Sequence, residues 1–150
     1  MGIGLKEEDK MSVNLYNSEG YLDPTAYEAL KNIEKKAKLS NKVVFICSPY
    51  AGDIKGNTAR ARRYGRFAVT KKVIPIIPHL MYPQFLYEDD LDERELGIEM
   101  GLVLLSKCQE LWVFGRKVST GMVVEIEKAK SLGIPIKYFD THCKQVGGME

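Results

Sequence analysis

The sequence is poor in cysteine and contains no long apolar run. Its 150 residues include three cysteines, and Cys47 and Cys108 lie far apart in apolar segments. This pattern is typical of buried free thiols rather than of disulfides or a zinc site. No apolar run approaches the roughly 20 residues that cross a bilayer, and residues 1–10 lack the apolar core of a signal peptide. We therefore expect a cytoplasmic protein with no metal, no organic cofactor and no membrane partner.

An excess of charge of one sign is also absent. Lys and Arg number 22 and Asp and Glu number 20, so the formal net charge is +2. A charge this small does not favour binding to a nucleic-acid polymer. The chain contains neither G-x-G-x-x-G nor G-K-[ST], which argues against a dinucleotide site or a P-loop. We expect residues 1–20, which are polar and aperiodic, to form a flexible leader and residues 21–150 to form a single domain.

Beyond residue 20, short apolar runs alternate with helical patterns. Asp23 followed by Pro24 is a helix-start signal. The apolar runs predict strands, and the periodic segments between them predict helices. The fold class predicted is α/β, an open and mostly parallel sheet of about four to five strands with helices on both faces. The expected strands are 43–47, 73–77, 111–114 and 134–139, and the main expected helices are 57–71, 92–107 and 121–132.

Two of the loops that follow predicted strands contain candidate ligand-binding residues. Ligands of such sheets bind at the carboxyl ends of the strands, so these loops should converge on one edge. In the first loop Tyr50 is a catalytic candidate that can stack on a base or position a sugar. Asp53 can bind ribose hydroxyls, and Ser48 and Gly52 lie beside them as candidate binding residues. The alternative is a tight turn built from Pro, Gly and Asp. His79 follows the second strand and is either a substrate ligand or a structural histidine.

The third loop leads into a helix that carries a carboxylate. Ser119, Gly121 and Met122 lie where the orphan amides and the dipole of a helix N-terminus stabilise an anion such as phosphate. Plain N-capping by Ser119 is the alternative. Glu125 follows, and a carboxylate there can attack an anomeric carbon and form a covalent glycosyl intermediate. Its alternative is a solvated carboxylate on the helix surface.

These loops together resemble the nucleoside 2-deoxyribosyltransferase-like superfamily, and in particular a bacterial and phage branch of it. The resemblance covers nearly the whole chain from about residue 12. It implies a flavodoxin-like, Rossmann-like fold and cleavage of N-glycosidic bonds of 2′-deoxynucleosides or their 5′-monophosphates. It also implies a homo-oligomer. The matching motifs are S-P-Y-A-G-D at Ser48–Asp53, P-H at Pro78–His79, E-L-W-V-F-G at Glu110–Gly115 and S-x-G-M-x-x-E-I at Ser119–Ile126.

The resemblance assigns roles to individual residues. It makes Glu125 the nucleophile and Ser119 a ligand of the 5′-phosphate, and it brings the first-strand loop to the same phosphate. The characterised enzymes have an Asp on the helix before the third strand, where this chain has Gly101. Glu99 is near, but two residues of helix turn it about 200° away. A non-catalytic nucleotide-binding or sensing module is therefore the alternative. A phosphoribohydrolase is disfavoured, because its P-G-G-x-G-T loop is absent.

Overall fold

The computed structural model describes residues 23–36 and 39–147. The chain divides into two compact units, residues 1–39 and residues 40–150. The leader expected at residues 1–20 lies outside the described residues, so that leader and its boundary with the domain stay predictions. None of the helices in the described ranges is long and apolar enough to cross a bilayer.

The described part of the first unit contains one helix, α2 (Pro24–Lys36). The carboxylate of Asp23 accepts hydrogen bonds from the backbone N–H groups of Thr25 and Ala26 at 2.9 and 3.4 Å. This confirms the helix start at Asp23 and Pro24, because the carboxylate satisfies amides that have no partner inside the helix.

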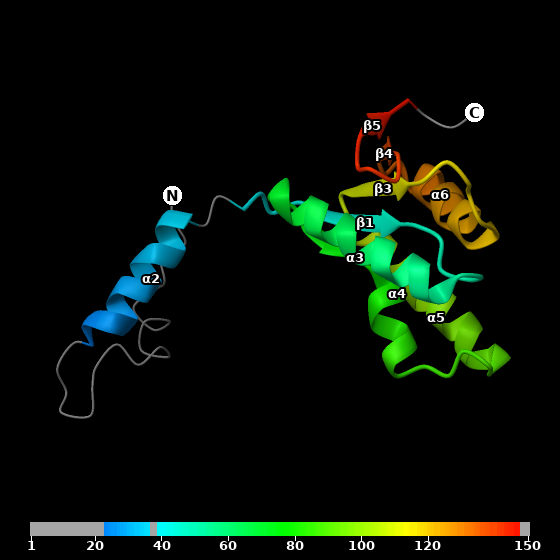
Figure 1. Cartoon of the computed structure of the whole chain (residues 1–150), viewed down its shortest axis with the longest axis horizontal. Coiled ribbons are helices and arrows are strands. Elements are labelled where there is room, and N and C mark those ends of the chain that lie inside the picture. The colour runs from blue at the N-terminus through cyan, green and yellow to red at the C-terminus, as the bar shows by residue number, and fades with distance from the viewer. Residues whose placement is uncertain (1–22, 37–38, 148–150) are drawn as a thin grey trace. The chain divides into compact units, whose positions relative to one another are not determined.

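The second unit is an α/β structure with a five-stranded sheet of order β2-β1-β3-β4-β5. The strands from β2 to β4 are parallel, and β5 is antiparallel to β4. Figure 1 shows α3 and α6 on opposite sides of the sheet. This confirms the predicted fold class. The elements are β1 (Val43–Cys47), α3 (Ile54–Thr70), β2 (Ile74–Ile76), α4 (Pro78–Met81), η1 (Tyr82–Gln84), α5 (Leu91–Ser106), β3 (Glu110–Phe114), α6 (Thr120–Leu132), β4 (Ile136–Phe139) and β5 (Gln145–Val146).

Alternate residues of the central strands face two separate cores. In β1, Phe45 and Cys47 pack toward α5 and α6, whereas Val44 and Ile46 pack toward α3. The same alternation runs through β3, because successive side chains of a strand point to opposite faces of the sheet. Both faces are buried, which explains why these strands are continuous apolar runs in the sequence.

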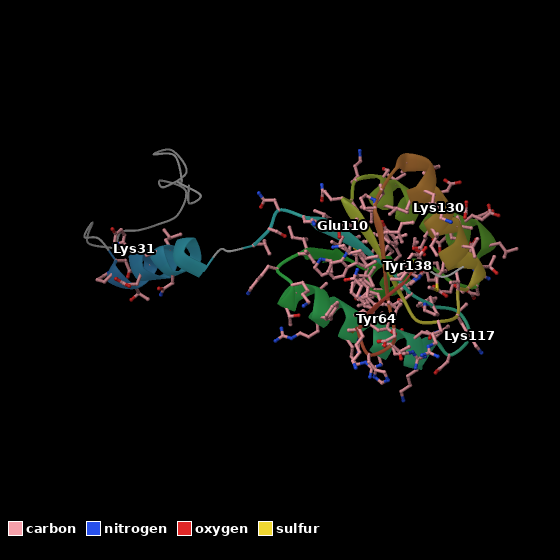
Figure 2. The ribbon with its side chains drawn as sticks, turned by 90° about the horizontal axis from the view of Figure 1, so that it is seen from above. Lys31, Tyr64, Glu110, Lys117, Lys130 and Tyr138 are labelled. Carbon is pink, nitrogen blue, oxygen red and sulfur yellow. The ribbon has the colours of Figure 1, made fainter. Side chains whose placement is uncertain are left out.

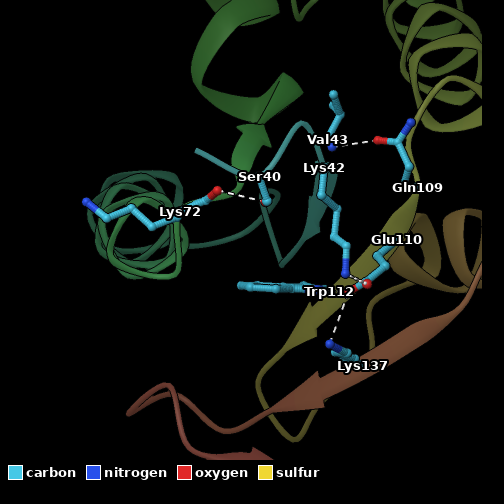
Figure 3. Close-up of polar contacts among 8 residues, drawn as sticks. All are labelled: Ser40, Lys42, Val43, Lys72, Gln109, Glu110, Trp112 and Lys137. Atoms are coloured by element: carbon cyan, nitrogen blue, oxygen red, sulfur yellow. Dashed lines mark hydrogen bonds and ion pairs between the residues drawn. The ribbon is translucent and has the colours of Figure 1, made fainter. Parts of the chain in front are cut away.

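A charged cluster joins three strands at the amino-terminal edge of the sheet. Glu110, at the start of β3, pairs with Lys42 at 2.6 Å and with Lys137 of β4 at 3.3 Å. The indole N–H of Trp112 also donates to its carboxylate at 2.9 Å. Figure 3 shows these contacts around the one carboxylate. The cluster lies at the opposite edge from the predicted ligand-binding loops and is structural.

Several element boundaries differ from the sequence prediction. Helix α3 begins three residues earlier than predicted, at Ile54, because the Asp53 side chain caps it by accepting from the N–H of Gly56. Strand β2 is shorter than predicted because Pro78 begins the short helix α4. The antiparallel β5 was not predicted, because its residues are exposed and show no apolar run.

Candidate functional site

The loops after β1, β2 and β3 leave the same edge of the sheet because these three strands are parallel. At this edge the rings of Tyr50 and His79 stack with their centroids 5.0 Å apart and their planes 25° apart. Tyr50 comes from the loop after β1, and His79 lies in the first turn of α4. The structure therefore brings together two candidate residues that the sequence separates by 29 positions.

His79 is partly buried beneath this contact. Burial lowers its pKa below the usual 6.5, and a hydrogen bond with the Ser48 backbone offsets part of that effect. The imidazole is therefore mostly neutral at pH 7, which suits a hydrogen-bonding group better than a permanent cation. Burial also raises the pKa of Tyr50, and the nearby carboxylate of Glu88 raises it further. Glu88 was not predicted as a site residue, because nothing in the sequence around it marks it.

Helix α6 begins with a side-chain cap. The hydroxyl of Ser119 accepts from the backbone N–H of Met122 at 3.3 Å, and the sulfur of Met122 accepts from the N–H of Ser119 at 3.5 Å. The capping alternative for Ser119 is therefore present. Met122 has only 1% of its surface exposed and packs in the core. Gly121 is exposed, and a Cβ there would meet no atom within 4 Å.

Glu125 lies one and a half turns into α6, with part of its carboxyl group enclosed. Burial raises its pKa from 4.5 to about 8. Cys47, at the end of β1, lies near it, since the pKa of the Cys47 thiol is raised first by burial and then by the Glu125 charge. Both groups are therefore mostly protonated at pH 7. The sequence analysis treated Cys47 only as a core thiol, which agrees with its full burial.

Two buried side-chain oxygens within the described ranges have no hydrogen-bond partner, Ser48 Oγ and Glu125 Oε2. Native structures leave few such groups, because a buried polar atom without a partner is unfavourable by about 1–3 kcal/mol. Both residues were predicted from the sequence as site residues. Ser48 directly follows Cys47, which senses the Glu125 charge. A buried polar atom without a protein partner is the pattern expected where a ligand supplies the missing partner, and this holds for each of the two oxygens.

The rest of the first loop is held by groups that the sequence analysis did not identify. Asn57 of α3 donates from Nδ2 to the carbonyls of Tyr50 and Ala51 at 3.0 and 3.2 Å. Gly52 has φ +95°, a conformation that favours glycine. The Asp53 carboxylate caps α3 and lies 3.6 Å from Arg60. The turn alternative for this loop is therefore present, and the Tyr50 ring stacks on His79 beside it.

No metal-binding arrangement is present in the described part of the chain, where no three His, Cys, Asp or Glu side chains gather closely enough.

The chain belongs to a protein family described as a domain of unknown function (DUF7768), whose model matches residues 42–139. No curated protein matches the chain. The matched segment runs from the residue before β1 to the end of β4 and contains the candidate site.

Three solved structures are similar to this chain. The 2-deoxyribosyltransferase from the psychrotolerant bacterium Bacillus psychrosaccharolyticus aligns with a TM-score of 0.58 and 13% identity, over 72% of this chain and 76% of that one. The 2-desoxiribosyltransferase from Leishmania mexicana gives 0.47 and 18%, over 66% and 64%. A conserved protein from Enterococcus faecalis V583 gives 0.45 and 14%, over 67% and 64%. The first alignment shows a 2-deoxyribosyltransferase-like fold for this chain.

Proposed function

We propose that the unit formed by residues 40–150 breaks the N-glycosidic bond of a nucleoside or nucleoside 5′-monophosphate, with Glu125 as the nucleophile. The observation that carries the proposal is the pair of buried oxygens without partners, Ser48 Oγ and Glu125 Oε2. Buried titratable groups with strongly perturbed pKa values cluster at functional sites. Their burial is unfavourable for folding, and it is retained where the reaction requires the shifted pKa. The fold shared with a 2-deoxyribosyltransferase supports the same reaction class.

In the proposed reaction the Glu125 carboxylate attacks C1′ of the sugar and the bond to the base breaks, which leaves a glycosyl ester on Glu125. Water or a second base then attacks C1′ and releases the carboxylate. The stacked Tyr50 and His79 orient the sugar or base. Ser48 donates a hydrogen bond to the substrate, and the backbone around Gly121 and Ser119 holds its anionic end. Since Glu125 is mostly protonated at pH 7, the attack starts from its ionised fraction.

Departure of the base is the difficult step in this site. The helix position that carries an Asp in the enzymes that this sequence resembles is Gly101, which is buried and has no atom within 4 Å of the place a Cβ would occupy. General acid catalysis typically increases the rate 10²–10⁴-fold. A site without that carboxyl is therefore expected to cleave the bond slowly unless the base is already protonated when it leaves.

Base release is the direct test of the proposal. The wild type is incubated with a panel of 2′-deoxynucleosides and their 5′-monophosphates, and free base is separated and quantified. We expect release from at least one compound and none from Glu125→Gln. Glu127→Gln is the matched control, because Glu127 is an exposed carboxylate on the same helix. No release from any compound, or equal release by Glu125→Gln and the wild type, contradicts the proposal.

The second candidate function is a nucleotide-binding module without turnover, which the missing side chain at Gly101 favours. Thermal unfolding with the same panel separates the two functions. A compound that raises the melting temperature and is recovered intact indicates binding alone, because a ligand that binds only the folded state stabilises it by mass action.

We also propose that the chain assembles with copies of itself, in the cytoplasm. Large apolar side chains are exposed along the segment that leads into and through α5, and exposed patches of this kind mark association surfaces. Size-exclusion chromatography with light scattering measures the assembly, and Leu91→Lys combined with Ile98→Lys should shift it to the monomer. A wild type that is monomeric at all concentrations contradicts this proposal. The side chains are Phe85, Tyr87, Leu91, Ile98 and Val103.

A further inference from the structure

A cleft of about 320 Å³ opens at the carboxyl ends of β1 and β3, on the face of the sheet that α3 covers. It is distinct from the Glu125 neighbourhood, because α6 covers the opposite face. Its volume lies at the lower end of the range of about 300–1,000 Å³ that is typical of small-molecule sites. The lining residues that matter here are Asn57, Arg60, Tyr64, Phe114, Arg116 and Lys117.

Cationic side chains line this cleft, and no carboxylate does. Neither Arg116 nor Lys117 forms an ion pair with any residue in the described ranges. The nearby Asp140 carboxylate accepts from the backbone N–H groups of His142 and Lys144 at 2.8 and 3.0 Å, within its own turn. The positive charge of the cleft is therefore left to solvent or to an anionic ligand.

Arg60 is already held at the wall of the cleft. Its guanidinium donates to Oδ1 of Asn57 at 2.7 Å and lies 3.6 Å from the exposed carboxylate of Asp53. Asn57 is itself buried and anchored to two carbonyls of the first loop. A side chain fixed in this way loses little freedom when a ligand binds, so its interaction with the ligand is more favourable.

The floor of the cleft is aromatic and rigid. The ring of Tyr64 is almost fully buried and stacks on Phe114 at 4.2 Å with the planes 14° apart. Burial raises the pKa of the Tyr64 hydroxyl, so this group stays protonated and can donate a hydrogen bond. Figure 2 shows Tyr64 among the packed side chains next to the sheet and Lys117 at the molecular surface.

Gly115 turns the chain from β3 toward the two outer cations. Its φ is +96°, which side chains rarely adopt, and its N–H donates to the carbonyl of Phe139 at 3.0 Å. This fixed turn joins the buried end of β3 to Arg116 and Lys117. Arg116 and Lys117 are neighbours in the sequence, but only the tertiary structure brings them to the same cleft as Arg60 of α3.

We propose that this cleft binds the phosphate group of a small phosphorylated molecule. Arg60, Arg116 and Lys117 pair with the phosphate charge, and the Tyr64 hydroxyl donates a neutral hydrogen bond. Arginine and lysine are suited to this ligand, because charge-assisted hydrogen bonds to phosphate are stronger than neutral ones. The phosphate belongs either to the nucleotide that Glu125 attacks, which would then hold its phosphate in this cleft instead of at the start of α6, or to a separate effector. The cleft can bind phosphate whether or not Glu125 is catalytic.

Isothermal titration of the full chain with inorganic phosphate, deoxyadenosine 5′-monophosphate and deoxyadenosine tests the proposal. We expect binding of at least one phosphorylated probe with a dissociation constant of about 1 mM or lower. Arg116→Gln combined with Lys117→Gln should weaken it about tenfold or more. Tyr64→Phe, which keeps the stacked ring, should weaken it about two- to tenfold.

The matched control is Arg94→Gln combined with Lys107→Gln, which removes two exposed charges on the α5 side of the sheet. It should bind the phosphorylated probes as the wild type does. Equal weakening in both double variants indicates diffuse electrostatic attraction and overturns the proposal. The proposal is also overturned if the wild type binds neither inorganic phosphate nor deoxyadenosine 5′-monophosphate.

Competition between the probes identifies the source of the phosphate. The cleft holds the substrate phosphate if two results are found together. Inorganic phosphate should compete with deoxyadenosine 5′-monophosphate, and Arg116→Gln combined with Lys117→Gln should weaken binding of the nucleotide but not of deoxyadenosine. If both bind at once, the cleft holds a separate phosphorylated ligand. Base release by a wild type that binds neither phosphorylated probe removes this inference and leaves the proposed function intact.

Discussion

Replacing Glu125 by Gln isolates the energetic effect of the buried carboxyl, since Gln keeps the size of the side chain and cannot ionise. Burial raises the pKa of Glu125 from 4.5 to about 8 in the folded chain. Between these two values the folded state keeps a proton that the unfolded state releases. The wild type therefore loses stability as the pH rises from 4.5 to about 8, and the loss is constant above that range. The Gln variant has no such group, so it lacks this contribution to the pH dependence of its stability.

The size of the effect follows from the two pKa values. A pKa difference of one corresponds to about 1.4 kcal/mol. The free energy of unfolding of the wild type should be reduced by at most about 1 kcal/mol at pH 5, about 3 kcal/mol at pH 7 and about 5 kcal/mol at pH 9. Glu125→Gln should therefore be as stable as the wild type near pH 5, within about 1 kcal/mol, and clearly more stable at pH 7 and 9.

Urea denaturation at pH 5, 7 and 9 measures these differences, and the fluorescence of Trp112 reports the transition because it is the single tryptophan and is buried in the sheet. Glu127→Gln is the control, since the Glu127 carboxylate is exposed and pairs with Lys130 at 3.5 Å on the surface. This variant should differ from the wild type by about 0.5 kcal/mol or less at every pH. A difference in the free energy of unfolding between Glu125→Gln and the wild type that does not change with pH would refute the conclusion that the Glu125 carboxyl is enclosed and protonated.

Three further predictions follow from the same structure. With an ionised Glu125 as nucleophile, kcat/KM for base release should rise with pH and level off above about 8. A fall in kcat/KM as the pH rises toward 8 would contradict the role of Glu125 as nucleophile. Gly101→Ala should stabilise the chain by about 0.5–1 kcal/mol in thermal melts, because helix interiors disfavour glycine and the new Cβ meets no atom within 4 Å; a loss of stability would mean that the space is filled. Glu110→Gln should reduce the free energy of unfolding at pH 7 by about 1–3 kcal/mol, because it weakens charge-assisted hydrogen bonds. Burial tends to raise the pKa of Glu110, but hydrogen bonds from two lysines and Trp112 outweigh it and lower the pKa. The stability difference between variant and wild type should therefore shrink in acid. A variant as stable as the wild type at pH 7 would contradict this prediction.

The central strands and the start of α6 were predictable because local signals there agree with the tertiary structure. The run from Val43 to Cys47 is apolar at every position, which suits a strand buried on both faces. Ser119 was predicted to cap a helix and does so. The helix α4 and the strand β5 escaped prediction, since neither is long or apolar enough to show a period.

The candidate site divides in the same way. Glu125 and Ser48 were identified as residue types in suggestive positions, but a helix carboxylate reads the same in a sequence whether it is solvated or enclosed. The packing of α6 on β1 makes Glu125 an enclosed acid with a pKa of about 8. The cleft was not predictable, because Arg60 lies more than fifty positions before Arg116 and the two meet only through the pairing of β1 with β3.

The sequence by itself determined the alternation of the main strands and helices, the mostly parallel sheet and the loops at its carboxyl edge, because apolar periodicity and capping residues act over a few neighbouring positions. The tertiary structure decided the properties that depend on surroundings. It left the oxygens of Ser48 and Glu125 without partners, stacked Tyr50 on His79 and brought Arg60, Arg116 and Lys117 to the cleft that Tyr64 also lines. Burial and charge at a site are sums over residues distant in sequence, and only the folded chain brings those residues together.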